Sequence, residues 1–201
     1  LKNRSVERML ALCCGTGRRA SKIRELSEKS FPITGVDISP LMCEQASERG
    51  LEVVQGDISD LEFKLDHSFD AITYLYAFGH LPSRTARLNV LRSCKAHLRP
   101  GGVFFADLFC LRNIHEWGAD IEAYHQKYRL NEQGYDAGDV FYKRMGGTHR
   151  AYLHYFKRDE ILDLFHEAGF ERVEIRKIGY TESSGQLHDR SDEGMYWVKA
   201  Q

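Results

Sequence analysis

The feature that most constrains this chain is a short apolar run that ends abruptly in glycines. Residues 9–20 read MLALCCGTGRRA, so the apolar segment stops at Gly15-Thr16-Gly17 and two arginines follow. Such a run predicts a buried parallel strand with a tight turn into a helix. Glycines at this turn let a ligand approach the backbone at the carboxyl end of the strand, where doubly wound sheets bind their ligands.

Strand and helix signals alternate along the first half of the chain. Apolar runs at residues 8–13, 33–36, 51–55, 70–75 and 103–106 predict five strands. The segments between them predict helices, and the start and stop signals of these helices are Ser39-Pro40, Gly50, Ser83 and Pro100-Gly101-Gly102. This rhythm predicts an α/β fold with a doubly wound, mostly parallel, Rossmann-like sheet.

The second half of the chain interrupts this rhythm and then completes the sheet. Residues 117–128 carry an apolar stripe at helical spacing, and residues 139–145 and 150–156 predict a hairpin around Gly146-Gly147. A helix over 159–168 and strands over 172–178 and 195–199 follow. We expect seven strands with an antiparallel last strand, and one domain over residues 1–201 in which residues 109–156 form an inserted helix and hairpin.

Composition excludes several classes of protein. The 201 residues are 42% hydrophobic and carry a formal net charge of −1, so no overall field attracts nucleic acid or a membrane. Five cysteines without a C-x-x-C pair, and the lack of a signal-peptide pattern, indicate buried thiols in a cytoplasmic protein. His149 and His154 have no further ligand at metal-binding spacing, so we expect no metal.

Two aspartates narrow the choice of ligand. Asp37 ends the second strand, and a carboxylate there accepts both hydroxyls of a ribose or else caps the next helix. The Gly15, Gly17 and Ala20 spacing also fits a dinucleotide, so NAD and S-adenosylmethionine both remain candidates. Asp57 follows the third strand, where its carboxylate can accept from the amine of an adenine or serve as an ordinary loop aspartate.

Five segments in order strengthen the second candidate. The segments LALCCGTG, GVDISPLM, QGDISDL, FDAITYLYAFGHL and LRPGGVFFADL, which lie within residues 6–108, resemble the class I S-adenosylmethionine-dependent methyltransferases. The later segments YFKRDEILDLFHEAGFERVEI and GMYWVKA look like the last helix and strands of that family. The resemblance implies methyl transfer from S-adenosyl-L-methionine to a small-molecule acceptor, with S-adenosyl-L-homocysteine as the product.

The resemblance also implies roles for individual residues around the cofactor. The loop under the methionine part would consist of Cys13, Cys14, Gly15, Thr16 and Gly17, and the ribose would be held by Asp37. The adenine would be contacted by Ile38, Met42, Asp57 and Ile58. The residues near the sulfonium would be Tyr74 and Leu75. Two positions depart from the family pattern, because Ala11 stands where an acid is usual and Cys13 where glycine is usual. Arg18 and Arg19 either bind the methionyl carboxylate or form a solvated helix face.

The acceptor is expected beyond the fourth strand. His80 is a candidate general base and Tyr76 a candidate for orienting the acceptor, whereas His80 bonding a backbone carbonyl is the structural alternative. Phe78 is expected to contact the acceptor. The predicted hairpin follows the fifth strand, so we expect it to lie over the acceptor site, with Tyr152 and His154 as substrate contacts. An edge hairpin that extends the core is the alternative.

Two rival functions remain open. An RNA methyltransferase of the same fold needs a basic patch, for which the candidates are Lys143, Arg144, Arg150, Lys157 and Arg158. No Asn-Pro-Pro-Tyr-like motif follows the fourth strand, which disfavours the amino-methylating enzymes that act on nucleic acid. A binding protein or an NAD-dependent oxidoreductase with the same glycine loop is the second rival.

Overall fold

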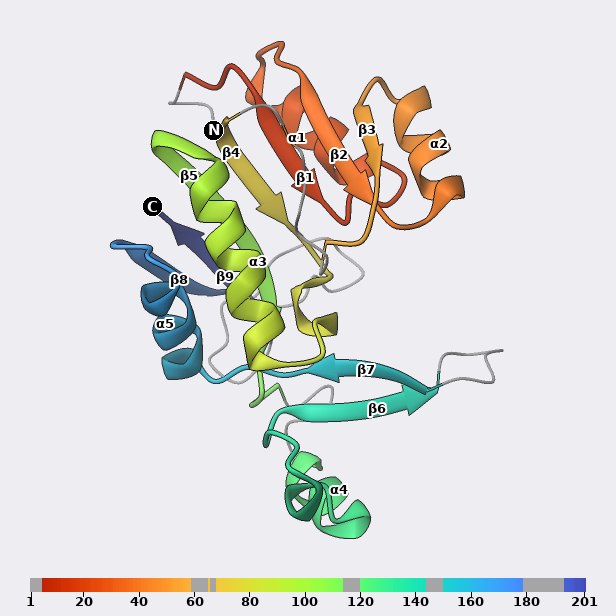
Figure 1. Ribbon diagram of the computed structural model, residues 1–201, viewed down its shortest axis with the longest axis vertical. Coiled ribbons are helices and arrows are strands. Elements are labelled where there is room, and N and C mark those ends of the chain that lie inside the picture. The colour runs from red at the N-terminus through yellow and green to blue at the C-terminus, as the bar shows by residue number, and fades with distance from the viewer. Residues whose placement is uncertain (1–4, 59–64, 66–67, 114–119, 144–149, 179–193) are drawn as a thin grey trace.

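Seven strands form one sheet in a computed structural model that describes residues 5–58, 65, 68–113, 120–143, 150–178 and 194–201 (Figure 1). The order across the sheet is β3-β2-β1-β4-β5-β9-β8, and only β9 runs antiparallel to its neighbours. This confirms the predicted doubly wound sheet with an antiparallel last strand. The strands are β1 (Met9–Leu12), β2 (Ile33–Asp37), β3 (Glu52–Gln55), β4 (Phe69–Tyr74), β5 (Leu98–Phe109), β8 (Val173–Ile178) and β9 (Met195–Ala200).

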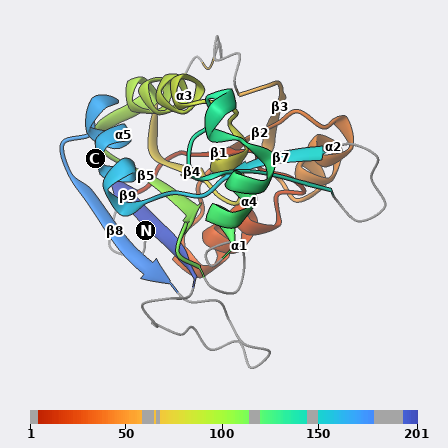
Figure 2. The same ribbon diagram turned by 90° about the horizontal axis from the view of Figure 1, so that it is seen from below.

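Helices cover both faces of the sheet, because alternate residues of the buried strands point to opposite sides. On β1, Met9 and Ala11 join the core under α1 (Arg18–Ser27) and α2 (Pro40–Glu48), whereas Leu10 and Leu12 join the core under α3 (Arg84–His97) and α5 (Arg158–Glu167). Figure 2 shows these two pairs of helices on opposite sides of the strands. The apolar run of β1 therefore supplies both cores.

The predicted helix starts are confirmed by their capping bonds. The Ser39 hydroxyl accepts from the Met42 amide, with Pro40 in the first turn, and the Ser83 hydroxyl accepts from the Ala86 amide. Such caps satisfy amides that have no partner inside the helix. The fifth strand is longer than predicted at both ends. α3 already ends at His97, so β5 begins at Leu98 and contains Pro100-Gly101-Gly102, and it continues to Phe109 by pairing with β9.

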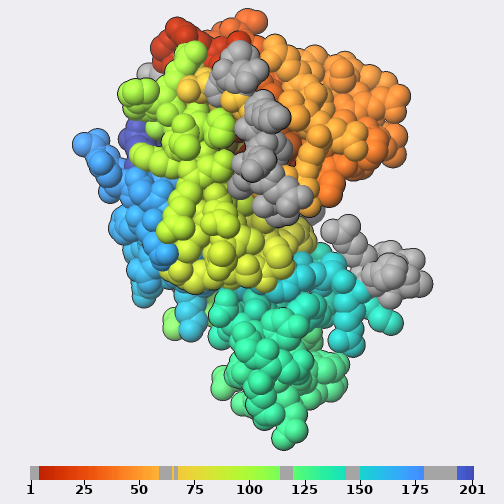
Figure 3. All heavy atoms as spheres, in the orientation of Figure 1, coloured from red at the N-terminus to blue at the C-terminus, as the bar shows by residue number. Residues whose placement is uncertain are grey.

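A second, two-stranded sheet lies beyond the carboxyl ends of the main strands. It consists of β6 (Asp139–Lys143) and β7 (Arg150–His154), with α4 (Ile121–Tyr128) packed against it. The predicted turn at Gly146-Gly147 lies outside the described residues. Figure 1 shows this unit below the arrowheads of β1, β2 and β4, and Figure 3 shows it as a lobe below the main body.

The bare backbone of Gly79 permits close packing between this lobe and the body. A short 3₁₀ turn, η1 (Phe78–His80), follows β4 and contacts β7. A Cβ atom added to Gly79 would come within 2.8 Å of the His154 carbonyl oxygen. The chain after β7 then returns to the body, where the Phe156 amide donates to the Phe109 carbonyl at 2.8 Å.

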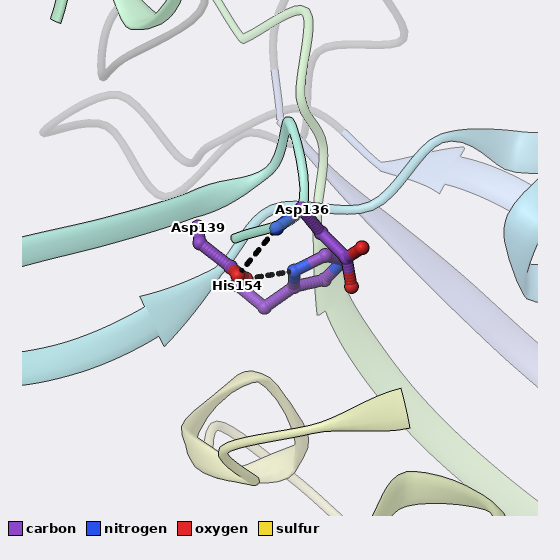
Figure 4. A group of neighbouring side chains, drawn as sticks. All are labelled: Asp136, Asp139 and His154. Carbon is purple, nitrogen blue, oxygen red and sulfur yellow. Dashed lines mark hydrogen bonds and ion pairs between the residues drawn. The ribbon is translucent and has the colours of Figure 1, made fainter. Parts of the chain in front are cut away.

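A buried polar network fixes β7 to the helices of the body, and Figure 4 shows two of its members, Asp139 and His154. The imidazole of His154 lies 2.6 Å from Asp139 Oδ1 through Nδ1, and 2.8 Å from Glu160 Oε1 of α5 through Nε2. The Tyr152 hydroxyl donates to the same Asp139 oxygen at 2.6 Å and accepts from the fully buried Arg87 of α3 at 3.1 Å. The network thus connects β6 and β7 to α3 and α5.

The network raises the pKa of its histidine and lowers the pKa of its aspartate. Burial alone would lower the pKa of His154, but hydrogen bonds to Asp139 and Glu160 outweigh burial and raise it. Burial alone would raise the pKa of Asp139, but hydrogen bonds from His154 and Tyr152 outweigh burial and lower it. Both shifts favour the charged pair.

Within the described residues, no helix combines the length and the apolar character that crossing a bilayer requires.

We predict that His154→Gln destabilises the fold by roughly 3–5 kcal/mol, because it leaves the buried Asp139 carboxylate without its cation. His154 has a raised pKa, so its contribution is complete below about pH 6.5 and is lost as pH rises through the folded-state pKa. Urea unfolding at about pH 6 and about pH 9 measures this loss. The exposed His166→Gln on α5 is the matched control. An unchanged pH dependence in His154→Gln would contradict the prediction.

Candidate active site

The glycine loop after β1 adopts the conformation that its sequence suggested. Gly15 and Gly17 have φ values of +53° and +74°, which favour glycine over residues with a Cβ atom. A Cβ on Gly17 would lie 3.1 Å from the Cα of Ala46 in α2, so this glycine also permits close helix packing. A Cβ on Gly15 would meet nothing within 4 Å, so the loop presents an open backbone there.

Asp37 connects this loop to the second strand and to α2. Its Oδ2 accepts from the Gly15 amide at 2.7 Å, and its Oδ1 accepts from the Ser39 amide at 3.0 Å. Each carboxylate oxygen has a further lone pair, so the side chain still has the capacity to accept from ligand hydroxyls. Asp37 therefore stabilises the start of α2, and its carboxylate can still bind the hydroxyls of a ribose.

The end of β3 reaches the same place. The Gly56 amide donates to the Asp37 carbonyl at 3.0 Å, which brings Asp57 beside the loop. The Ile58 side chain is buried in the core, whereas Ile38 is 62% exposed at the start of α2. Of these two isoleucines, Ile38 therefore presents the apolar surface that an adenine ring could contact.

The cysteines and Tyr74 contribute shape and packing to the site. Burial raises the pKa of Cys13 and of Cys14 to about 12, so both thiols stay protonated at neutral pH. The Tyr74 ring is fully buried against Phe78. Leu75 faces the open side instead, where it lines a small pocket under the glycine loop together with Cys13, Cys14 and Arg19.

Asp107 lies beside the expected acceptor region and was not among the predicted site residues. The Tyr76 amide donates to Oδ1 of Asp107, and the guanidinium of Arg19 stacks on the Tyr76 ring, 3.8 Å from its centroid. Tyr76 is 46% exposed and has a φ of +59°. Burial raises the pKa of Asp107 to about 6, although the Tyr76 hydrogen bond and the Arg19 charge lower it. A polar residue in the apolar run FFADLF was the available signal.

The other predicted acceptor residues are placed in three ways. Phe78 is fully buried and packs on Phe156. His80 directs Nδ1 to the Tyr152 carbonyl at 2.8 Å, which is the backbone contact of the structural alternative; its Nε2 makes no hydrogen bond to the part of the chain described. Tyr152 and His154 face the buried network.

A three-residue cluster in this network has metal-binding residue types. Ligand atoms of Asp136, Asp139 and His154 lie within 4.8 Å of one another. Both His154 nitrogens already contact carboxylates, and the Asp139 oxygens accept from Tyr152 and from the Asp136 amide. Hydrogen bonds thus account for this arrangement, and the expected absence of a metal stays a prediction.

The basic residues considered for RNA do not gather at one place. Lys143 and Arg150 pair at one end of the two-stranded sheet, and Lys157 and Arg158 follow its other end at the start of α5. Arg144 lies outside the described residues.

An apolar groove adjoins the glycine-loop pocket. It has a volume of about 310 Å³ and shares Thr73 and Leu75 with that pocket. Its lining residues are Ile23, Leu26, Ser27, Thr73, Leu75, Phe105 and Trp197.

Known proteins similar to this chain are consistent with this geometry. Residues 9–102 match the family described as a methyltransferase domain. A probable phthiotriol/phenolphthiotriol dimycocerosates methyltransferase 2 of Mycobacterium ulcerans is 38% identical over 126 residues, which cover 59% of this chain and 46% of that protein. The chain therefore spans less than half of that relative. A demethylmenaquinone methyltransferase of Thermotoga maritima is 31% identical over 168 residues, covering 82% of this chain and 70% of the relative.

Solved structures share the fold. A methyltransferase dependent on S-adenosylmethionine from Methanosarcina mazei has a TM-score of 0.70 at 18% identity, with 98% of this chain and 93% of that chain covered. The DhpI-SAM-HEP complex has a TM-score of 0.64 at 20% identity, with 96% and 78% covered. With the family match, the Thermotoga relative and the seven-stranded sheet together, the chain belongs to the class I S-adenosylmethionine-dependent methyltransferases.

Proposed function

We propose that this chain transfers the methyl group of S-adenosylmethionine to a small-molecule acceptor bound beyond the carboxyl ends of β4 and β5. The observation that carries the proposal is the open glycine loop held to Asp37 beside the ends of β3 and β4. Two relatives are named for methylating demethylmenaquinone and phthiotriol or phenolphthiotriol dimycocerosates, which supports a small acceptor. The apolar groove beside the loop supports an acceptor with an apolar part.

The proposed donor site uses the residues that the motifs place there. Residues 13–17 lie under the methionine part, Asp37 accepts from the ribose, and Asp57 accepts from the adenine amine. Ile38 and Met42 flank the adenine, Ile58 supports that edge from the core, and Leu75 lies near the sulfonium. Tyr74 supports the loop from below, since its buried ring belongs to the core against which Cys13 packs.

Positioning supplies most of the proposed rate enhancement. When bound, the donor supplies a methyl group on a sulfonium, which is a good leaving group. The chain aligns the acceptor with that methyl group, and such alignment is worth roughly 7–11 kcal/mol. Nε2 of His80 receives the acceptor proton in this proposal, because the Tyr152 carbonyl fixes the imidazole through Nδ1.

The insertion over residues 109–156 covers the acceptor in this proposal. Its strands β6 and β7 lie beyond the carboxyl ends of the sheet, on the side where strand ends carry ligands (Figure 1). Tyr152 and His154 act on the acceptor indirectly, because they hold β7 to the body and β7 holds His80.

We predict that the wild-type protein binds S-adenosylhomocysteine and not NAD, and that Asp37→Ala weakens this binding by about 3 kcal/mol, or more than a hundredfold. The lost carboxylate removes the ribose acceptor and the contact with the Gly15 amide. Isothermal titration calorimetry measures both ligands. Asp37→Asn separates charge from shape, and the exposed Asp163→Asn on α5 is the control. Parental affinity in Asp37→Ala would show that the site is assigned wrongly.

We predict that His80→Ala lowers turnover at least roughly a hundredfold and leaves the affinity for S-adenosylhomocysteine unchanged. The assay follows label from methyl-tritiated S-adenosylmethionine into RNA and into a panel of quinols, phenols and amines. The exposed His166→Ala is the matched control. Unchanged turnover would leave alignment of the acceptor as the whole mechanism. Transfer of label to RNA instead would support the rival function.

A further inference from the structure

Two side chains of opposite charge meet the same tyrosine at the edge of the glycine-loop pocket. Arg19 extends from the first turn of α1 and stacks its guanidinium on the Tyr76 ring at 3.8 Å. Asp107 extends from β5 and accepts the Tyr76 amide hydrogen through Oδ1. Tyr76 is held between them in the left-handed region, where a non-glycine residue is strained and persists only if its surroundings fix it.

The Arg19 charge acts on Asp107 from beyond salt-bridge distance. Arg19 and Asp107 form no salt bridge with each other or with another side chain in the part of the chain that the structure describes. Asp107 is half-buried, and a carboxylate in such a position is costly unless a cation or further donors reach it. Its second oxygen, Oδ2, therefore has the capacity to accept from a ligand.

The sheet register places these charges on neighbouring walls of one site. Tyr74 pairs with Ala106, so Leu75 and Asp107 are the next residues along β4 and β5. Leu75 and Arg19 both line the pocket under the glycine loop. Ala11 of β1 lines the same pocket and brings no charge to it. The residues that line the pocket thus include the cation of Arg19 and no acid, and the acid of Asp107 lies next to them.

We propose that Arg19 and Asp107 form an ionic clamp for the amino-acid end of S-adenosylmethionine, with Arg19 on the carboxylate and Asp107 on the ammonium. This inference rests on the proposed function. An α-amino acid carries both charges on one carbon, which suits two opposite charges on either side of a single tyrosine. Asp107 would then supply from β5 the negative charge that the residues lining the pocket lack.

Two ligands that differ only in this end test the clamp. S-adenosylhomocysteine carries the amino-acid group, and 5′-methylthioadenosine lacks it while keeping the adenosine and the sulfur. Loss of a hydrogen bond between charged groups weakens binding by roughly 10- to 100-fold. We expect Asp107→Asn and Arg19→Gln each to lower the affinity for S-adenosylhomocysteine by this factor, as measured by calorimetry. We expect neither variant to change the affinity for 5′-methylthioadenosine.

Two controls separate the clamp from a structural effect. Asp163→Asn removes the same charge from the exposed face of α5, and Arg19→Lys keeps the cation. The first is expected to bind as the wild type does, and the second to recover part of the loss. Asp107 variants that weaken both ligands equally, or neither, would overturn the clamp. Failure of the wild type to bind S-adenosylhomocysteine would overturn the proposed function as well.

The pH dependence gives a second readout. Arg19 of α1 is the charged side chain that acts on Asp107, while the turn after β4 presents the Tyr76 amide and β9 presents Trp197. The pKa of Asp107 is about 6, so the carboxylate is lost as pH falls through that value. We expect the affinity of the wild type for S-adenosylhomocysteine to fall in the same range. A flat profile in the wild type would contradict the clamp, and Asp107→Asn is expected to be flat.

Discussion

The carboxylate of Asp37 fixes the geometry of the proposed donor site. Its two oxygens accept from the Gly15 amide of the glycine loop and from the Ser39 amide at the start of α2. The main-chain carbonyl of Asp37 accepts from the Gly56 amide after β3. A single residue thus fixes three turns at the carboxyl edge of the sheet. Because charge-assisted hydrogen bonds are stronger than neutral ones, the open loop is held in place before any ligand arrives.

A second polar arrangement holds the inserted strands. The buried His154 is bound on both sides by carboxylates, from Asp139 of β6 and Glu160 of α5. A satisfied network of this kind specifies one arrangement, because each alternative leaves a buried polar group without a partner. Its consequence reaches the acceptor side, since β7 provides the carbonyl that orients His80. The polar side chains of β7 therefore act mainly on the shape of the site.

The sequence predicted the sheet and the donor loop because both leave local signals. Short apolar runs, capping serines and glycines at turns repeat within a few residues, and they are interpretable without knowing which strands are neighbours. The position of Asp37 after the second strand followed from the same pattern. Asp107 gave a weaker signal, because one acid in an apolar strand is typical of many exposed strand positions.

Local patterns in the sequence were enough to predict the order of the elements, the doubly wound sheet and the residues that end β1 and β2. The tertiary structure decided which side chains face the open edge. It buried Ile58, Phe78 and His154, and it brought Arg19 and Asp107 to either side of Tyr76. The physical reason is that the direction in which a side chain points depends on strand register and on contacts with residues distant in the chain. A local pattern of apolar and polar residues specifies neither.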